Sequence, residues 1–341
     1  MNKLYYRKQF LLVFLISILV SIATMYVSLS NGTFDISPLE AIRTLLGLEK
    51  SNDYSMVIFE FRLPRIVIGA LVGFALGIAG SVLQGITRNQ LADPGILGIH
   101  SAAGMTIVLY MFFLQGSVDG ASWLSILNMS FFGWIGGTIA AIFLFLFSQN
   151  RGSVDPKRII LVGIALNAGF SAITLYVSLK MNPQDFEMAT VWLSGSIYSA
   201  SWQQILAILP WIVILVPILC WKSRILDVLQ FDDVTATGIG VHKDRERFIL
   251  LLCCVGLVSA GVSVSGSIGF IGLIAPHIAR RLVGIHHQYS LPISGTIGMV
   301  MVLIGDFIGK TIFSPAELPV GIVISIIGVP YFIYLLFRSR K

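Results

Sequence analysis

The chain has 341 residues, of which 56% are hydrophobic and only 12% are charged, and its mean hydropathy is +0.86. A soluble domain carries about 25% charged residues, so this composition excludes a soluble enzyme or binding module and indicates an integral membrane protein. The formal net charge of +6 lies in short segments between apolar runs, which favours a topological role over nucleic-acid binding.

Long runs without charged residues recur along the chain. A membrane-spanning helix needs about 20 apolar residues, and some runs are long enough for more than one helix. We therefore expect an all-α integral membrane protein with about ten transmembrane helices in one polytopic domain, residues 1–341. The runs are Phe10–Phe34, Ile66–Thr87, Gly95–Val118, Gly120–Asn150, Ile159–Leu179, Met188–Trp221, Phe248–Ala279, Gln288–Gly305 and Leu318–Phe337.

The distribution of basic residues predicts the orientation. If ten helices follow a cytoplasmic N-terminus, 17 of the 23 Lys and Arg residues fall in cytoplasmic segments. This bias follows the positive-inside rule, so we expect a multi-pass protein of the cell membrane with both termini in the cytoplasm. The first run is too long for a signal-peptide core and is interpreted as a retained helix.

The second span opens with two arginines and continues with a stripe of small residues. Arg62 and Arg65 lie three residues apart and are expected to share a helical face, either as interfacial anchors or as a docking site. Small side chains then recur every four residues, which favours close helix packing, with pore lining as the alternative. The stripe consists of Gly69, Gly73, Gly77, Ser81 and Gly85.

Polar residues also form a stripe on the fifth span. Asn167, Ser171, Thr174 and Ser178 follow one another at helical spacing and so lie on one face. Such groups need water or hydrogen-bonding partners within a membrane. The stripe therefore predicts either hydrogen bonds between helices or the lining of a translocation pathway.

The segment Lys222 to Arg247 is the longest charged stretch expected on the cytoplasmic side. Asp232 and Asp233 can cap a short helix, and Gly238 and Gly240 allow the chain to turn after it. Such a helix could fit into a groove of a partner. A solvated loop is the alternative interpretation.

Two later spans carry unusual residues. Ile268–Leu282 combines glycines with Pro276, which we expect to break the helix, and a broken backbone at membrane depth must be buried or line a watery path. This pattern favours a transporter. In the ninth span, Asp306 and Lys310 are expected to form an i, i+4 ion pair.

The sequence shows no catalytic constellation, metal-ligand spacing or nucleotide-binding loop, so we expect neither an enzyme nor a bound cofactor or metal. The apolar runs also lack the ionisable groups that an ion-coupled secondary transporter needs at mid-membrane. Energy for transport must then come from an ATPase on another chain.

Several motifs, in this order and spacing, resemble the FecCD-type permeases, which are membrane subunits of ABC importers for ferric siderophores, haem and cobalamin. The details look most like Gram-positive ferric siderophore permeases. The motifs are Phe61-Arg-Leu-Pro-Arg65, Gly77-Ile-Ala-Gly-Ser-Val-Leu-Gln84, Arg88-Asn-Gln-Leu-Ala-Asp-Pro-Gly-Ile-Leu-Gly98, Trp192-Leu-Ser-Gly-Ser196, Gly269-Phe-Ile-Gly-Leu-Ile-Ala-Pro-His-Ile-Ala-Arg280, Glu317-Leu-Pro-Val-Gly321 and Gly328-Val-Pro-Tyr-Phe332.

The resemblance implies a BtuC-like permease fold and a set of partners. A second permease subunit, identical or homologous, would frame the pathway, and the fifth span would flank it. Two cytoplasmic ATPase subunits would bind the segment Lys222 to Arg247, which would couple ATP hydrolysis to transport. An extracytoplasmic lipoprotein or periplasmic binding protein would deliver the ferric siderophore. Haem or cobalamin is the alternative substrate within the family, and an ion-coupled secondary transporter or a membrane enzyme is a remote one.

The resemblance also implies roles for particular residues. Arg62 and Arg65 would meet acidic residues of the binding protein, with a smaller contribution from Lys310, whose ammonium makes only a point contact. Coupling to the ATPase would involve Asp232, Asp233, Ala236 and Gly238.

Overall fold

The computed structural model describes residues 3–32, 34, 36–48, 51–114, 123–150, 153–231, 233–314 and 316–338. These residues are almost entirely helical, with one two-stranded hairpin. The elements are α1 Lys3–Ser30, α2 Pro38–Leu45, α3 Asn52–Met56, the π-helix η1 Val57–Arg62, α4 Leu63–Thr87, α5 Ile99–Leu114, α6 Trp123–Phe147, β1 Gln149–Asn150, β2 Ser153–Val154, α7 Pro156–Ser178, α8 Pro183–Leu193, α9 Trp202–Trp221, α10 Ser223–Val228, α11 Asp233–Gly238, α12 Lys243–Ser265, α13 Ile271–Val283, α14 His287–Ile312 and α15 Val320–Arg338.

Within the described residues, eight helical stretches are long and apolar enough to cross a membrane. They include α1, α6, α7, α9, α12, α14 and α15, and the continuous stretch from α3 through η1 into α4. The shorter helices α5 and α13 complete the expected set of about ten. The predicted all-helical membrane fold is therefore confirmed.

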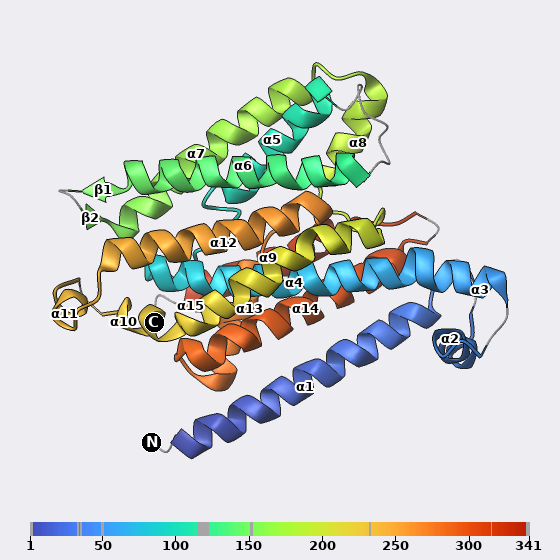
Figure 1. The fold of residues 1–341 in the computed structure, drawn as a ribbon, viewed down its shortest axis with the longest axis horizontal. Helices are drawn as coiled ribbons and strands as arrows, with labels where there is room; N and C mark the ends of the chain where they lie inside the picture. Colours follow the sequence, from blue (N-terminus) through green and yellow to red (C-terminus); the bar gives the residue numbers. More distant parts are fainter. Residues whose placement is uncertain are drawn as a thin grey trace.

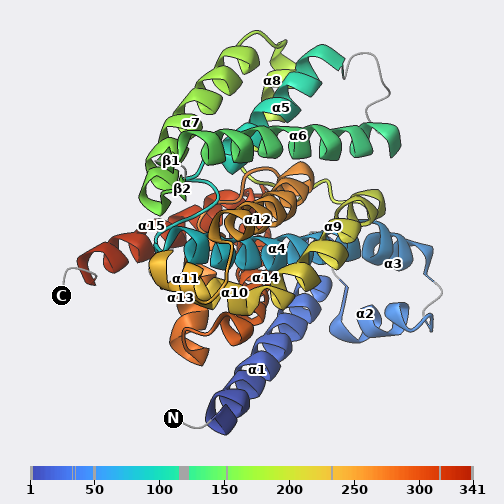
Figure 2. The ribbon, with the colours of Figure 1, turned by 60° about the vertical axis from the view of Figure 1, so that its left-hand side comes forward.

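Helix α4 runs through the middle of the molecule (Figure 1). It packs against α12 on one side and α14 on the other, and α5, α6 and α7 form a further layer beyond α12. Helix α1 lies on the opposite side, against α14 (Figures 1 and 2). The described ends of the chain lie at the same end of the molecule as α10, α11 and the hairpin, whereas α2 and α3 lie at the opposite end.

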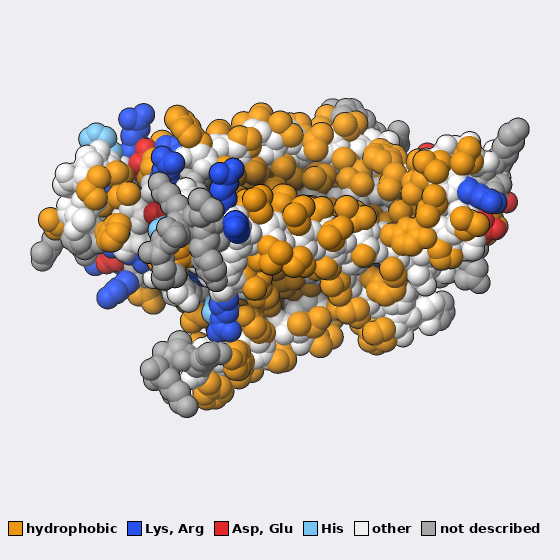
Figure 3. Space-filling view, turned by 90° about the horizontal axis from the view of Figure 1, so that it is seen from below, with side chains coloured by type: hydrophobic (Ala, Val, Ile, Leu, Met, Phe, Trp, Pro, Cys, Tyr) orange, Lys and Arg blue, Asp and Glu red, His pale blue; other side chains and the backbone are white. Residues whose placement is uncertain are grey.

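The surface matches this arrangement. On the face seen in Figure 3, charged side chains gather near the two ends of the molecule, and the middle is almost entirely apolar. Individual helices present large exposed hydrophobic residues outward, such as Leu19 on α1 and Leu161 and Ile164 on α7. An apolar belt between polar ends is the surface that a lipid bilayer requires.

The small-residue stripe of α4 is a packing surface. A Cβ atom added to Gly73 would lie 2.3 Å from the carbonyl oxygen of Gly298, and one added to Gly77 would lie 2.1 Å from that of Ser294. No side chain fits between the two backbones at these positions. The helix-packing interpretation is therefore confirmed for the contact of α4 with α14.

The predicted helix break at Pro276 is wrong. Pro276 lies inside α13, which continues to Val283. The backbone instead breaks before α13, at residues 266–270, where Gly266 and Phe270 have φ angles of 66° and 65°. Proline lacks only one backbone hydrogen bond within a helix, whereas a positive φ cannot continue a right-handed helix at all.

Candidate functional site

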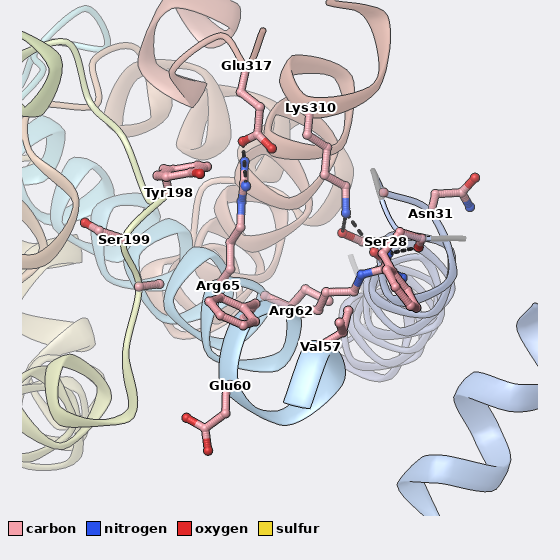
Figure 4. Close-up of a pocket in the computed structure, with 15 residues that line it drawn as sticks. Ser28, Asn31, Val57, Glu60, Arg62, Arg65, Tyr198, Ser199, Lys310 and Glu317 are labelled. Carbon is pink, nitrogen blue, oxygen red and sulfur yellow. Dashed lines mark hydrogen bonds and ion pairs between the residues drawn. The ribbon is translucent and has the colours of Figure 1, made fainter. Parts of the chain in front are cut away.

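The structure brings Arg62, Arg65 and Lys310 together around a cavity of about 450 Å³ at the end of the molecule that carries α2 and α3. Arg62 ends the π-helix η1, Arg65 lies in the first turns of α4, and Lys310 lies near the end of α14. Figure 4 shows that the two arginine side chains diverge, because Arg62 points toward α1 and Arg65 points toward Glu317. Both arginines therefore line one cavity but bind different segments of the chain.

Arg65 is the centre of an ion cluster. Its Nε and Nη2 donate to the carboxylate of Asp306 at 2.8–3.1 Å, and its Nη1 donates to Glu317 Oε2 at 2.7 Å. The side chains of Arg65 and Asp306 are 14% and 6% exposed. This two-pronged geometry gives both orientation and strength, as expected for a guanidinium on a carboxylate.

The expected ion pair between Asp306 and Lys310 is wrong. The Asp306 carboxylate binds Arg65, and the Lys310 ammonium donates to the backbone oxygen and to Oγ of Ser28, both at 2.7 Å. Arg62 likewise donates to the backbone oxygens of Leu29 and Phe34. The cations of this cavity therefore tie α4 and α14 to the end of α1 and to the loop before α15.

The segment Lys222 to Arg247, which was expected on the cytoplasmic side, contains two short helices, α10 and α11. The expected helix begins at Asp233, Ala236 is fully buried, and Gly240 makes the turn with a φ of 88°. A side chain added at Gly238 would meet no atom within 4 Å. Asp232 and the side chain of Asp233 lie outside the described residues, so their capping role stays a prediction.

Helix α10 is anchored to the ends of α4 and α14. Gln230 Nε2 donates to the Gly85 carbonyl at 2.9 Å, and Arg88 Nε donates to the Leu229 carbonyl at 2.6 Å. Asp227 Oδ1 accepts the backbone N–H of His287 at 2.9 Å, which satisfies one of the free donors at the start of α14.

The Asp227 carboxylate is also close to the imidazole of the same histidine. Nδ1 of His287 lies 2.6 Å from Asp227 Oδ1. Burial acts to raise the pKa of Asp227, but the hydrogen bonds from His287 outweigh burial and hold the pKa below its usual range.

The four polar residues of the fifth span line one cavity of about 510 Å³. Asn167, Ser171, Thr174 and Ser178 all belong to α7, and they face side chains contributed by α5, α8 and the broken segment before α13. Thr174 and Ser178 are buried, whereas Ser171 is exposed. Among the described lining residues there is no Asp, Glu, Lys or Arg. The lining residues outside α7 are Gly95, His100, Ser101, Phe186, Thr190, Leu193, Ser194 and Ser267.

Sequence reasoning missed the facing wall of this cavity. His100 is the second residue of α5, Ser267 lies in the broken segment, and His100 Nδ1 lies 3.4 Å from Ser267 Oγ. A broken backbone does line a polar cavity, as expected for membrane depth, although the break is at residues 266–270. The only local signal was the pair Thr190 and Ser194, which share a face at the end of α8.

A second cavity extends this polar surface toward α15. It has a volume of about 650 Å³ and shares Leu193, Ser194 and Ser267 with the first. Its other wall comes from α15 and includes Gly321 and Ser325. The α15 wall is mostly apolar, because its other lining residues are Ile322, Ile326, Val329 and Pro330, so the hydroxyl groups are concentrated beside α7, α8 and the broken segment.

An all-helical bundle with an apolar belt, a polar cavity between its helices and a helical segment projecting at one end is a multi-pass membrane permease. The sequence profile of the FecCD transport family matches residues 15–338, so the chain belongs to that family. This agrees with the interpretation of the chain as a transport subunit.

Curated relatives match over nearly their whole length. The iron-uptake system permease protein FeuC of Bacillus subtilis (strain 168) is 52% identical over 316 residues, covering 93% of this chain and 94% of FeuC. The iron(3+)-hydroxamate import system permease protein FhuG of the same organism is 44% identical over 330 residues, covering 97% and 98%.

A solved structure shares the fold. A metal-chelate type ABC transporter in an inward-facing conformation is 30% identical, with a TM-score of 0.82 over 96% of this chain and 99% of that one. The expected permease fold of ABC importers is therefore confirmed, and so is the interpretation as a transport subunit in place of an enzyme.

Proposed function

We propose that this chain is the permease of an ATP-driven importer of ferric siderophores and that the hydroxyl-lined cavity beside α7 is part of the translocation pathway. The cavity is the observation that carries the proposal, because its described lining offers hydroxyl and amide groups without fixed charge. Such a lining suits a bulky polar chelate. The names of FeuC and FhuG, which concern iron uptake and iron(3+)-hydroxamate import, support the substrate class.

A second permease subunit is needed to close this pathway. Ser171 is exposed on α7 although α7 is one of the helices that can span a membrane. A hydroxyl directed at lipid could bond only to the backbone of its own helix, whereas a partner surface would use the whole polar stripe, so we place a second subunit, identical or homologous, over this face. The chelate would then pass between the two chains by alternating access.

The ATPase subunits are placed on α10 and α11. Large apolar side chains are exposed there, namely Phe231 (57%), Val234 (81%) and Ile239 (62%). Both described chain ends lie at the same end of the molecule. We take this end as the cytoplasmic one. Gly238→Arg would add a bulky charge in open space beside these residues, so it should weaken ATPase association without disturbing the fold.

The binding protein is placed on the opposite end, over the cavity lined by Arg62, Arg65 and Lys310. Arg65 is already held by Asp306 and Glu317, so an arriving carboxylate would compete most easily for Lys310, which binds the two oxygens of Ser28. Arg62 lines the same cavity and is the second candidate. The exchanges Arg62→Gln and Lys310→Gln test this docking without breaking the ion cluster. Normal uptake by the double variant would exclude a docking role for these two cations.

The pathway itself is tested with single cysteines at Asn167, Ser171 and Thr174. The three natural cysteines, Cys220, Cys253 and Cys254, are free and are first replaced. We expect each new thiol to react with a membrane-impermeant maleimide in the assembled transporter, and we expect the rate to change when ATP is trapped on the ATPases.

Ile173 supplies the matched control for this experiment. It lies on the same helix, is 46% exposed and does not line the cavity, so a cysteine there should face lipid and stay unreactive. Equal labelling of Ile173→Cys and Ser171→Cys, or no response to nucleotide at any position, would show that α7 does not line the route. Uptake assays with ferric siderophore, haem and cobalamin then identify the substrate.

A further inference from the structure

Two side chains of α12 hold the backbone of a single hairpin residue. Asp244 Oδ1 accepts the N–H of Val154 at 3.1 Å, and Arg247 Nη1 donates to the carbonyl oxygen of Val154 at 2.8 Å. Asp244 and Arg247 lie three residues apart, so they emerge from one face of α12. Val154 is 2% exposed and Arg247 is 1% exposed, so the arginine contact is buried, whereas the Asp244 contact is part-buried.

The captured residue is directly continuous with the start of α7. Val154 ends β2, and the next residue, Asp155, is the N-cap of α7, with its side chain accepting the N–H of Lys157 at 2.9 Å. The Asp155 N–H donates to the Ser148 carbonyl at 3.0 Å, which closes the hairpin on α6. Val154 therefore moves with the first turn of the helix that carries the polar stripe.

The capturing residues are directly continuous with the cytoplasmic segment. Asp244 lies in the first turn of α12, which follows α11 after the turn at Gly240. Lys222 at the end of α9 also binds Glu246 of α12 at 2.5 Å. This ion pair joins the residue before α10 to the first turn of α12, so it ties together the two ends of the segment that contains α10 and α11. A displacement of α11 is thus carried into the first turn of α12.

Burying an arginine is costly, and an apolar contact would be enough to pack a hairpin. Hydrogen bonds to both the N–H and the C=O of one residue do something different, because they fix the direction of the chain as well as its position. They also do not depend on the side chain that is held. This is a connection suited to passing on movement.

We propose that Asp244 and Arg247 form a clamp that couples movement of the ATPase-docking segment to α7. Both are positioning residues, since neither touches the pathway, and the inference rests on the roles proposed above for α11 and α7. Without the clamp, ATP binding would still move α11, but α7 would no longer follow.

The test uses the full transporter with Ser171→Cys as the reporter in the cysteine-free background. Two variants, Asp244→Ala and Arg247→Met, each remove one arm of the clamp. The exchange Asp244→Asn keeps an acceptor for the Val154 N–H, and Lys157→Met removes an exposed cation close to the held residue, outside the segment Lys222 to Arg247. Each protein is measured for ATPase co-purification, ATP hydrolysis, uptake, and labelling of Cys at position 171 with and without trapped nucleotide.

We expect Asp244→Ala and Arg247→Met to keep the ATPase bound and active, to lose the nucleotide response of the reporter, and to lower uptake per ATP hydrolysed by roughly tenfold. Asp244→Asn and Lys157→Met should behave like the parent. A contact that is merely structural would instead lower thermal stability and yield in the Ala and Met variants, while the nucleotide response of the folded fraction would persist, and that result would overturn the clamp.

The two proposals fail in different ways. If the parent reporter itself does not respond to nucleotide, α7 does not move, and both the pathway assignment and the clamp are wrong. If the parent responds and the clamp variants respond equally, only the clamp is wrong. Should one clamp variant not assemble, the other arm is measured by the same criteria.

Discussion

Arg65 and Asp306 join the two most closely packed helices of the molecule by a two-pronged ion pair. Arg65 comes from the start of α4 and Asp306 from the last turns of α14, the same helices whose backbones touch at Gly73 and Gly77. Glu317, from the loop before α15, completes the cluster. One arginine therefore holds three segments of the chain together at the end opposite to α10 and α11.

Removing Arg65 should destabilise the fold. Arg65→Met leaves the nearly buried Asp306 carboxylate without its cation, and breaking a buried pair in this way costs about 3–5 kcal/mol. We expect a clear fall in the midpoint of thermal unfolding in detergent. Arg43→Met, at an exposed position in α2 at the same end, is the matched control and should have no measurable effect. A double variant with Asp306→Leu should recover part of the loss, because no unpaired charge remains.

Gly77 should tolerate no larger residue. The Cβ and branches of valine in Gly77→Val would collide with the Ser294 carbonyl and force α4 away from α14. Overpacking of a tight interior costs about 1–3 kcal/mol, and more where backbone must move. Gly169→Val in α7 is the control, because an added Cβ meets nothing within 4 Å there. The yield of monodisperse protein measures the difference, and equal yields would contradict the close backbone contact.

Asp93 should make stability depend on pH. It lies in the loop between α4 and α5, and burial raises its pKa to about 6. The native state then keeps a proton that the unfolded chain releases, so the free energy of unfolding should fall as pH rises from about 4 to about 6 and level off above, a loss on the order of 3 kcal/mol.

The exchange Asp93→Asn should abolish this slope. The amide oxygen of asparagine can still accept the Gly95 N–H, which donates to Asp93 Oδ1 at 2.8 Å. Unfolding midpoints at pH 5 and pH 8 should therefore differ in the parent and agree in the variant, after subtraction of the slope common to both. Identical slopes in the two proteins would place the carboxyl in a solvated environment.

Asp227 should stabilise the fold in its ionised form, in contrast to Asp93. Asp227→Ala leaves the first-turn N–H of His287 without its acceptor, at a cost of about 1–3 kcal/mol. Since the pKa of Asp227 is lowered in the folded protein, its contribution is complete above the ordinary carboxyl range and is lost only in stronger acid. The difference between parent and variant should thus be present at pH 8 and disappear only in strong acid, measured against the exposed control Asp53→Ala.

The sequence predicts features that repeat along one helix. The four-residue spacing of Gly73 and Gly77 indicated a packing face, and the spacing of Asn167, Ser171 and Thr174 placed these side chains on one wall of one cavity. Such patterns are local, because helical geometry alone brings their members together.

Contacts between distant helices were beyond local reasoning. Lys310 is one turn from Asp306, so it was the natural partner in sequence, yet Arg65 approaches from another helix with better geometry. His100 and Ser267 lie 167 residues apart in the sequence and meet because α5 packs against α12, whose end leads into the segment that contains Ser267. The sequence did not indicate the break at Gly266, because a glycine can equally belong to a packing stripe. Proline is a known helix breaker, so the break was predicted at Pro276 instead.

The uncharged lining of the cavity beside α7 bears on how long a cargo can dwell there. Hydroxyl and amide groups offer many weak contacts of similar strength. The cargo therefore binds with a similar, small free energy at each position along the surface, and no single position holds it tightly. A cargo held this loosely leaves as readily as it enters, so throughput is favoured over discrimination. We therefore expect the choice among chelates to be made before entry, by whatever protein presents them, and a change of one hydroxyl in the passage to alter speed more than preference.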